Sequence, residues 1–390
     1  MSTDNVSAHG LECGQDAAAT LAGARRVVVK VGSSSLARQD GHLSVAKLHS
    51  LVEALVAYAD LGHEVVLVSS GAQAAAMGPL NLKVKPRTLA GAQAAASVGQ
   101  GLLIAEYTRA FGTFGIQVGQ VLLTAEDVLR RNHYKNARRA LEQLIALGVV
   151  PVINENDTVA TDELRFGEND KLAALVAHLV GADALILLSD VDALYTGPPE
   201  VAGSKRVPVV TRFSDLEALD IGRSGSQVGT GGMATKVAAA AMATTSGIPV
   251  LLTSAVNASA AFHGQNVGTW FYATGKRLAP RQLWLAYAAD IRGQIIVDAG
   301  AAQAITTRNA SLLPAGVVGT NGDFESGDVI EVVDQDGIVL ARGRSGFGAQ
   351  RMEQVKGLSM ANIESAAGKF YAHEAVHRDE LVVMARHRRA

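Results

Sequence analysis

Short apolar runs recur along the first two thirds of the chain, and each one leads into small or polar residues. The runs are RRVVVKVG (25–32), EVVLVSSGA (64–72), IQVGQVLL (116–123), VVPVIN (149–154), ALILLSD (184–190) and IPVLLTS (248–254). Their valines, leucines and isoleucines are mostly contiguous rather than alternating, which is typical of strands buried on both faces of a sheet. We therefore predict a buried strand at each run.

The segments between these strands carry apolar residues at helical spacing. In the segment 44–63, one helical face collects Val45, Leu48, Leu51, Val52, Leu55 and Val56. Further helices are expected near 88–110, 134–147, 169–180 and 233–246. Strands that alternate with amphipathic helices predict an α/β fold, with a mostly parallel sheet sandwiched by helices.

The pattern changes after about residue 275. Brief strands are expected at LWLAYA, GQIIVD, GDVIEVVD and GIVLARG, with Gly, Asp and Asn turns and a single helical stretch, AAQAITTR. This pattern is typical of a small β-rich domain. The expected organisation is a flexible extension (1–24), an α/β domain (25–275), a linker (276–282), a β-rich domain (283–370) and a C-terminal tail (371–390).

Composition narrows the class of protein. The chain has 390 residues, 48% of them apolar, and a net charge of −2, which is not the strongly basic balance of a dedicated nucleic-acid binder. A single cysteine excludes an intramolecular disulfide and a cysteine metal cluster. The first residues lack the features of a secretory signal, and no apolar stretch is long and uncharged enough to span a membrane. We expect a cytoplasmic protein that does not bind membranes.

Several polar loops follow the expected strands directly, where α/β sheets bind their ligands. KVGSSS (30–35) offers the cation of Lys30 and the backbone of Gly32, which suit phosphate oxygens. SSGA (69–72) offers the hydroxyl of Ser70 and a close backbone approach at Gly71. Each loop taken alone also fits an ordinary turn.

Acidic and amide side chains follow the later strands. INENDT (153–158) brings Asp157, whose carboxylate suits an ammonium group or Mg²⁺, although asparagines and aspartates also form plain turns. FGENDKL (166–172) places Asn169 and Asp170 where helix caps are common. LSDVDALYT (188–196) adds Ser189 and Asp190, which suit a ribose or a metal if the loop is more than a turn.

A glycine loop near the middle of the chain, GTGGMATK (229–236), resembles a Walker A motif without its final Ser/Thr. A flexible linker is the competing interpretation. The lysine opens an alanine-rich helix, so backbone N–H groups and Lys236 would together face an anion. The loop is therefore a candidate phosphate site.

Taken in their order, these loops resemble the amino acid kinase family. The resemblance covers about residues 25–275, and the set NENDTVA, GENDKL and GTGGMATK is similar to the members that phosphorylate glutamate. The C-terminal region resembles a PUA domain, which is an RNA-binding module in other proteins. The resemblance implies the amino acid kinase fold, followed by a PUA-like domain.

The resemblance also implies roles for individual residues. The catalytic set falls on Lys30, Lys236 and Asp170, with Asp170 organising the two lysines. The substrate-binding positions fall on Ser70, Gly71, Asp157 and Asn169. The ATP-binding positions fall on Lys30, Gly32, Ser189, Asp190, Thr230, Gly231, Gly232, Met233, Ala234, Thr235 and Lys236. Ser33 and Glu168 stand where many members have threonine and aspartate.

The implied reaction transfers the γ-phosphoryl group of ATP, with Mg²⁺, to the side-chain carboxylate of L-glutamate. This is the first step of proline biosynthesis, and the residues that ligate Mg²⁺ are not assigned. The implied partners are proline as a feedback inhibitor, glutamyl phosphate reductase and further copies of the chain. Two alternatives stay open: a different carboxylate or carbamate acceptor, and an RNA-binding regulator whose basic patch comprises Arg342, Arg344, Arg351 and Lys356.

Overall fold

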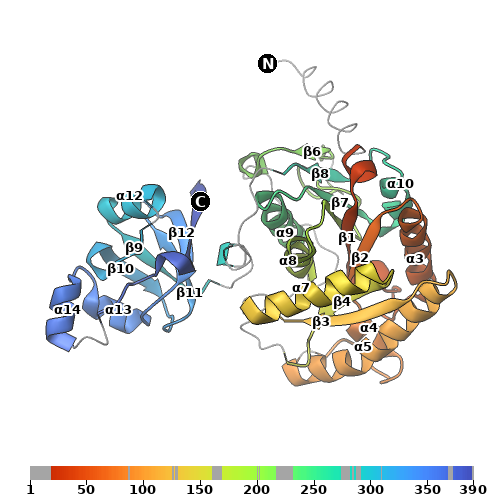
Figure 1. Ribbon diagram of the computed structural model, residues 1–390, viewed down its shortest axis with the longest axis horizontal. Helices are drawn as coiled ribbons and strands as arrows, with labels where there is room; N and C mark the ends of the chain where they lie inside the picture. The colour runs from red at the N-terminus through yellow and green to blue at the C-terminus, as the bar shows by residue number, and fades with distance from the viewer. Residues whose placement is uncertain are drawn as a thin grey trace, which may run out of the picture. The chain divides into compact units, whose positions relative to one another are not determined.

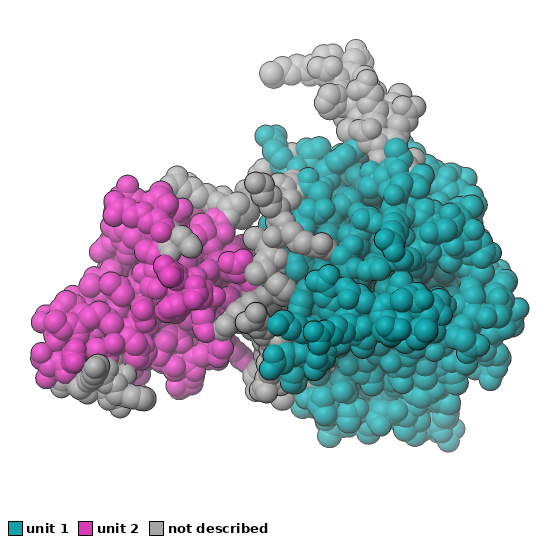
Figure 2. Space-filling view, viewed as in Figure 1, with its two compact units in different colours: residues 1–278 teal, residues 279–390 magenta. Residues whose placement is uncertain are grey.

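The chain folds into two compact units, Met1–Leu278 and Ala279–Ala390, which we treat separately (Figure 2). The computed structural model describes residues 19–86, 88–124, 127, 131–159, 169–199, 201, 203–216, 232–273, 282, 285–286, 291–308, 310–367 and 372–388. Within these residues, no helix has the length and apolar character that crossing a membrane requires.

The first unit is built on an eight-stranded sheet of order β3-β4-β2-β1-β5-β7-β8-β6 (Figure 1). Its strands are β1 Arg26–Val31, β2 Glu64–Ser69, β3 Val118–Leu123, β4 Val150–Glu155, β5 Ala184–Ser189, β6 Val209–Val210, β7 Val250–Ser254 and β8 Thr269–Phe271. Every pairing is parallel except that of β7 with β8. The predicted buried strands and the mostly parallel sheet are confirmed.

Helices cover both faces of this sheet (Figure 1). They are α2 Ser33–Leu36, α3 Val45–Ala59, α4 Ala72–Met77, α5 Leu89–Gly112, α7 Arg131–Ala146, α8 Asn169–Val180, α9 Met233–Thr245 and α10 Ala258–Phe262. Alternate β1 residues Val27, Val29 and Val31 share one apolar cluster with α3, α5 and α10. The other β1 side chains, Val28 and Lys30, therefore point toward the opposite face, where α8 packs against β1.

The buried face of α3 follows the predicted periodicity with one exception. Leu48, Leu51, Val52, Leu55 and Val56 are buried, but Val45 is 45% exposed. Val45 is the first helical residue, and it lies one turn beyond the part of α3 that packs.

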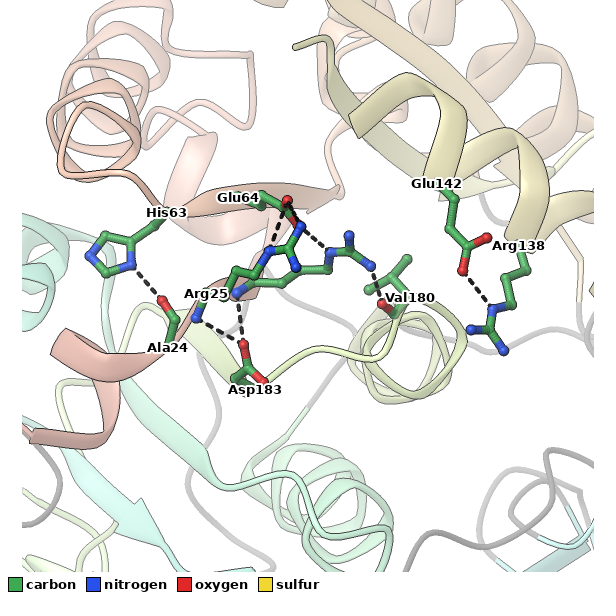
Figure 3. Close-up of polar contacts among 9 residues, drawn as sticks. Ala24, Arg25, His63, Glu64, Arg138, Glu142, Val180 and Asp183 are labelled. Atoms are coloured by element: carbon green, nitrogen blue, oxygen red, sulfur yellow. Dashed lines mark hydrogen bonds and ion pairs between the residues drawn. The ribbon is translucent and has the colours of Figure 1, made fainter. Parts of the chain in front are cut away.

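The start of β1 is held by polar contacts at the amino ends of the strands, shown in Figure 3. Asp183 accepts hydrogen bonds from the backbone N–H groups of Arg25 and Arg26, and the Arg25 guanidinium pairs with Glu64 at 3.0 Å. Residues 19–23 are helical, and Leu21 is buried in the core. Packing thus begins a few residues before the domain start expected at residue 25.

The second unit contains a five-stranded sheet of order β10-β9-β11-β12-β13. Its elements are β9 Gly293–Val297, α12 Ala299–Arg308, β10 Val317–Gly322, β11 Val329–Val333, β12 Ile338–Arg344, α13 Ala349–Val355, α14 Met360–Ala367 and β13 Leu381–Arg388. The β-rich character is confirmed, but three details differ. Leu285 and Ala286 form a π-helical turn rather than a strand, α13 and α14 are additional helices, and the expected tail contributes β13.

Three of the four basic residues considered as a patch lie beside acidic side chains, and the fourth, Arg351, donates a hydrogen bond to Gln354 at 2.7 Å. Arg342 is directed toward the fully buried Glu331, with a nitrogen–oxygen distance of 3.0 Å. Lys356 pairs with Glu353, and Arg344 lies 3.9 Å from Glu380. The RNA-binding alternative, which rests on the resemblance of this unit to a PUA domain, stays a prediction.

Gly99 of α5 lies against the first turn of α4. A Cβ atom at Gly99 would fall 1.7 Å from the carbonyl oxygen of Ala72, whereas a Cβ at Gly101 would meet nothing within 4 Å. We predict that Gly99→Ala lowers the free energy of unfolding by about 1–3 kcal/mol, because backbone must move. Gly101→Ala, on the same helix, should raise it by up to about 1 kcal/mol.

Urea unfolding of the two variants beside the parent chain measures this difference. The change in the free energy of unfolding should be negative for Gly99→Ala and positive for Gly101→Ala. A Gly99→Ala variant as stable as Gly101→Ala would show that the close approach of the two helices is not required.

Candidate active site

The carboxyl ends of four neighbouring strands, β4, β2, β1 and β5, form one edge of the central sheet. Polar residues lie at each of these ends: Glu155 on β4, Ser69 on β2, Lys30 on β1 and Ser189 on β5. All four are buried. A parallel sheet gathers such residues because strands that run in the same direction end together.

A buried charged triad lies at this edge. The Nζ atom of Lys30 is 2.6 Å from Oδ1 of Asp170, and the Nζ atom of Lys236 is 3.4 Å from Oδ2. The three residues come from β1, α8 and α9, and their relative exposures are 2%, 0% and 6% for Lys30, Asp170 and Lys236. Two buried ammonium groups therefore share one carboxylate.

Local structure explains how the triad forms. The alternation of β1 directs Lys30 to the face on which α8 packs. Both α8 and α9 begin near the sheet edge, so Asp170 and Lys236 fall in their first turns. The hydroxyl oxygen of Thr235 lies 3.2 Å from Oδ2 of Asp170 and 2.9 Å from the carbonyl oxygen of Gly232, and its single proton can be shared between these two acceptors, which joins the start of α9 to the triad.

Asp170 is held ionised by its neighbours. Burial alone would raise the pKa of this carboxyl group, but Lys30 and Lys236 together lower it to about 2. With two ammonium groups and one carboxylate, the cluster carries a net positive charge in a site that excludes water. Such a cluster suits an anionic ligand with several oxygens, such as a phosphoryl group.

A second group of polar contacts surrounds Asn169, the residue before Asp170. Its Nδ2 lies 3.0 Å from the carbonyl oxygen of Ser69, 3.0 Å from Oγ of Ser70 and 2.6 Å from Oδ1 of Asn154. Gly71 follows with φ +111°, a left-handed conformation that favours glycine, and starts α4. Asn169, Ser70 and Gly71 thus come together at the ends of β2 and β4.

The remaining described candidates lie at the same edge. The Gly32 N–H donates to the carbonyl of Leu188, so the turn after β1 is joined to the end of β5. The Ser189 hydroxyl lies 3.1 Å from Oδ1 of Asp190, which is exposed. Asp157 is half-buried two residues beyond the end of β4.

Part of the glycine loop lies outside the described residues. Gly232 precedes α9, and Met233, Ala234 and Thr235 lead to Lys236 in its first turn. Thr230, Gly231 and Glu168 are not among the residues that the structure describes. The roles given to all these residues remain predictions.

Sequence reasoning missed Asn154 as a site residue. Asn154 is the final residue of VVPVIN and lies near the end of β4. Its side chain is buried against Asn169. The signal that could have found it is a polar asparagine at the carboxyl end of a buried strand, next to the loop INENDT.

Comparison with known proteins gives the family. Residues 25–254 match the amino acid kinase family, and residues 293–366 match the PUA domain. The chain is 52% identical to a glutamate 5-kinase of Streptomyces coelicolor, over 93% of this chain and 97% of that protein. It is 50% identical to one of Thermobifida fusca, over 94% and 95%, and 52% identical to one of Bifidobacterium longum, over 93% and 97%.

Proposed function

Because the chain belongs to the amino acid kinase family, we propose that it phosphorylates the side-chain carboxylate of L-glutamate with ATP. The product is L-glutamyl 5-phosphate, and the reaction is the first step of proline biosynthesis. The names of the relatives give the acceptor. The observation that carries the phosphoryl-transfer chemistry is the buried triad of Lys30, Asp170 and Lys236.

The reaction needs charge neutralisation rather than a general base. The glutamate carboxylate, with an ordinary pKa of about 4.3, is already ionised at neutral pH. The barrier arises because this anion must approach an anionic phosphate. Catalysis then consists of positioning the two groups and compensating their charge.

In this proposal, Lys30 and Lys236 contact the phosphate oxygens, and Asp170 positions both ammonium groups. Their shared carboxylate keeps the two cations close together without a direct clash. Backbone N–H groups near Gly32, whose own N–H is bonded to Leu188, and in the loop from Thr230 to Lys236 would complete the phosphate site. Ser189 and Asp190 would hold the nucleoside.

The acceptor would lie beside Asn169, Ser70 and Gly71, which meet at the ends of β2 and β4. Asp157, just beyond β4, carries the carboxylate suited to the substrate ammonium group. An N-acetylated acceptor lacks that ammonium group, so Asp157 favours a free amino acid over acetylglutamate.

Mg²⁺ enters this proposal as part of the MgATP substrate. Among the described residues, no cluster of His, Cys, Asp or Glu could hold a metal ion. Both oxygens of Asp170 face lysine ammonium groups. The described residues therefore offer no protein-held Mg²⁺ site, whereas phosphate oxygens and water bind this ion readily. When bound there, the ion supplies additional positive charge at the phosphates.

Further partners stay predictions that follow from the proposed reaction. Proline as a feedback inhibitor, a reductase that consumes the labile acyl phosphate, and homo-oligomers belong to this set. An ATP-dependent biosynthetic step also agrees with the cytoplasmic location expected from the sequence.

An acyl-phosphate trap tests the proposed reaction. ADP release is measured with MgATP and a panel of glutamate, aspartate, acetylglutamate and carbamate, with hydroxylamine present to convert an acyl phosphate into a hydroxamate. Hydroxamate formation that depends on L-glutamate is expected. Formation with another acceptor alone would reassign the substrate, and no ADP release with any acceptor would reject the kinase assignment.

We predict that Asp157→Asn raises KM for glutamate far more than KM for ATP. The substitution removes the negative charge that would pair with the substrate ammonium group, and such charge-assisted contacts contribute about 1.5–3 kcal/mol. A rise of about ten- to a hundredfold follows. Steady-state kinetics with each substrate varied in turn measures it, and equal changes in both KM values would argue against this role.

A further inference from the structure

Three side-chain amides form a relay from α5 to the acceptor side of the site. Oε1 of Gln100 accepts a hydrogen bond from Nδ2 of Asn154 at 2.7 Å. Oδ1 of Asn154 in turn lies 2.6 Å from Nδ2 of Asn169. The three residues belong to α5, β4 and α8, which are far apart in the sequence.

Backbone groups at two points fix the direction of every amide in the relay. The N–H of Glu155 can only donate, so the Asn154 atom that it meets at 2.9 Å must be the oxygen. The carbonyl of Ser69 can only accept, so Asn169 must present its nitrogen there. Asn154 is left with its nitrogen facing α5, where an acceptor is required, and Gln100 supplies that oxygen.

The close packing of α5 makes this contact possible. Gly99, the neighbour of Gln100, is the residue whose missing Cβ lets α5 lie against the backbone of Ala72, directly after Gly71. Two turns further along α5, the hydroxyl of the buried Tyr107 lies 2.8 Å from Oγ of Ser69. The helix therefore contacts the ends of both β4 and β2, which frame the proposed acceptor position.

We propose that Gln100 is a positioning residue for the acceptor amino acid. It fixes the amide of Asn154, and Asn154 fixes the side chain of Asn169. The inference rests on the proposed function, because it concerns the acceptor side of that site. Gln100 has no contact with the lysine–aspartate triad among the interactions of the described residues, so the effect should be selective for the acceptor.

Gln100→Met tests the proposal, because methionine has a similar length and flexibility but lacks the carboxamide acceptor. Losing this acceptor leaves the buried nitrogen of Asn154 without its partner on α5. We expect KM for L-glutamate to rise about tenfold, with KM for ATP changed by less than about twofold. Gln100→Glu retains an acceptor oxygen and should restore most of the affinity for glutamate.

Gln143→Met is the matched control, because Gln143 is exposed on α7 and the same substitution there should leave both KM values unchanged. Calorimetric titration of each variant with glutamate, in the absence of turnover, gives the same comparison for binding. Thermal unfolding of each variant shows whether the fold is retained.

The outcomes separate this inference from the proposed function. If the parent chain forms no glutamate-dependent hydroxamate, the proposed function fails. If the parent chain is active but Gln100→Met binds glutamate normally, the positioning role is overturned. Equal rises in both KM values, or no recovery with Gln100→Glu, would also overturn it, because general loosening of α5 would then explain the result.

Discussion

Lys236→Ala is expected to lower kcat for glutamate phosphorylation by at least about 10²–10³-fold, while the fold is retained. Lys236 is 94% buried at the start of α9, and its ammonium group is one of two that face Asp170. In the proposed reaction, this cation compensates the negative charge that is spread over the oxygens of the transferring phosphoryl group in the transition state. A preorganised charge in a buried site acts without the reorganisation that water would need, so its loss falls mainly on kcat.

Retention of the fold is expected because Asp170 keeps a closer partner. Lys30 lies 2.6 Å from the carboxylate, compared with 3.4 Å for Lys236. The pKa of Asp170 should stay below its ordinary value, so no uncompensated buried carboxylate is created. Rapid-quench or steady-state kinetics at saturating ATP and glutamate measures kcat, and circular dichroism checks the fold.

Lys47→Ala provides the matched control, since Lys47 is an exposed lysine of α3 in the same unit. Its kcat should stay within about twofold of the parent value. Unchanged kcat in Lys236→Ala would contradict the assignment of the triad as the phosphoryl-transfer site.

The central sheet could be predicted from the sequence because its strands are buried on both faces. In ALILLSD, the contiguous apolar residues leave no doubt about burial, and β5 is buried along its whole length. The elements of the second unit are harder to predict, because its strands are short and the apolar residues of its helices show only a weak helical periodicity. AQRMEQV, which forms α13, buries only Met352 and Val355, too few positions for a pattern to stand out.

The candidate site was predictable only in part, for a different physical reason. Lys30, Asn169 and Asp170 could be proposed because each adjoins a strand or a helix start with a characteristic loop. The partnership of Asn154 with Gln100 could not, since it joins residues 54 positions apart and depends on how closely α5 packs. The local sequence does not indicate how closely α5 approaches α4. The structure shows this close approach at Gly99, where a Cβ atom would overlap the backbone of Ala72.

The same limitation applies to the charge balance of the triad. Sequence supplies two lysines and an aspartate that are far apart along the chain. The family resemblance implies that Asp170 organises the two lysines, but only the fold shows the geometry, with one ammonium group at each carboxylate oxygen. Because Asp170 is the shared counter-charge of two buried lysines, its substitution is expected to affect both stability and activity.

Asp170→Asn is expected to lower the free energy of unfolding by about 3–5 kcal/mol and to reduce kcat strongly. Asparagine keeps the size of the side chain but removes the only negative charge of the triad. Lys30 and Lys236 would then be two buried cations with no counter-charge from this side chain. Their repulsion should move both ammonium groups away from the positions that the phosphoryl group needs.

The pH dependence of this effect gives an internal check. The ordinary pKa of the carboxyl group is 3.8, and its neighbours lower the value to about 2 in the folded chain. A lowered pKa means that the carboxylate stabilises the fold above its ordinary pKa and loses this contribution as pH falls toward the folded value. The difference in unfolding free energy between the parent chain and Asp170→Asn should therefore be constant near neutral pH and shrink between about pH 4 and about pH 2.

MgATP should partly rescue the Asp170→Asn variant, and this outcome separates a charge effect from a packing effect. The triphosphate brings the negative charge that the substitution removes, so its binding should relieve the repulsion between the two lysines. A ligand that binds only the folded state raises the unfolding temperature in proportion to its binding free energy. Thermal unfolding with and without a non-hydrolysable ATP analogue should show a larger increase for Asp170→Asn than for the parent chain. Asp60→Asn, at an exposed aspartate after α3, should show the parent increase. An equal or smaller increase in Asp170→Asn would mean that Asp170 holds the fold without setting the charge of the phosphate site.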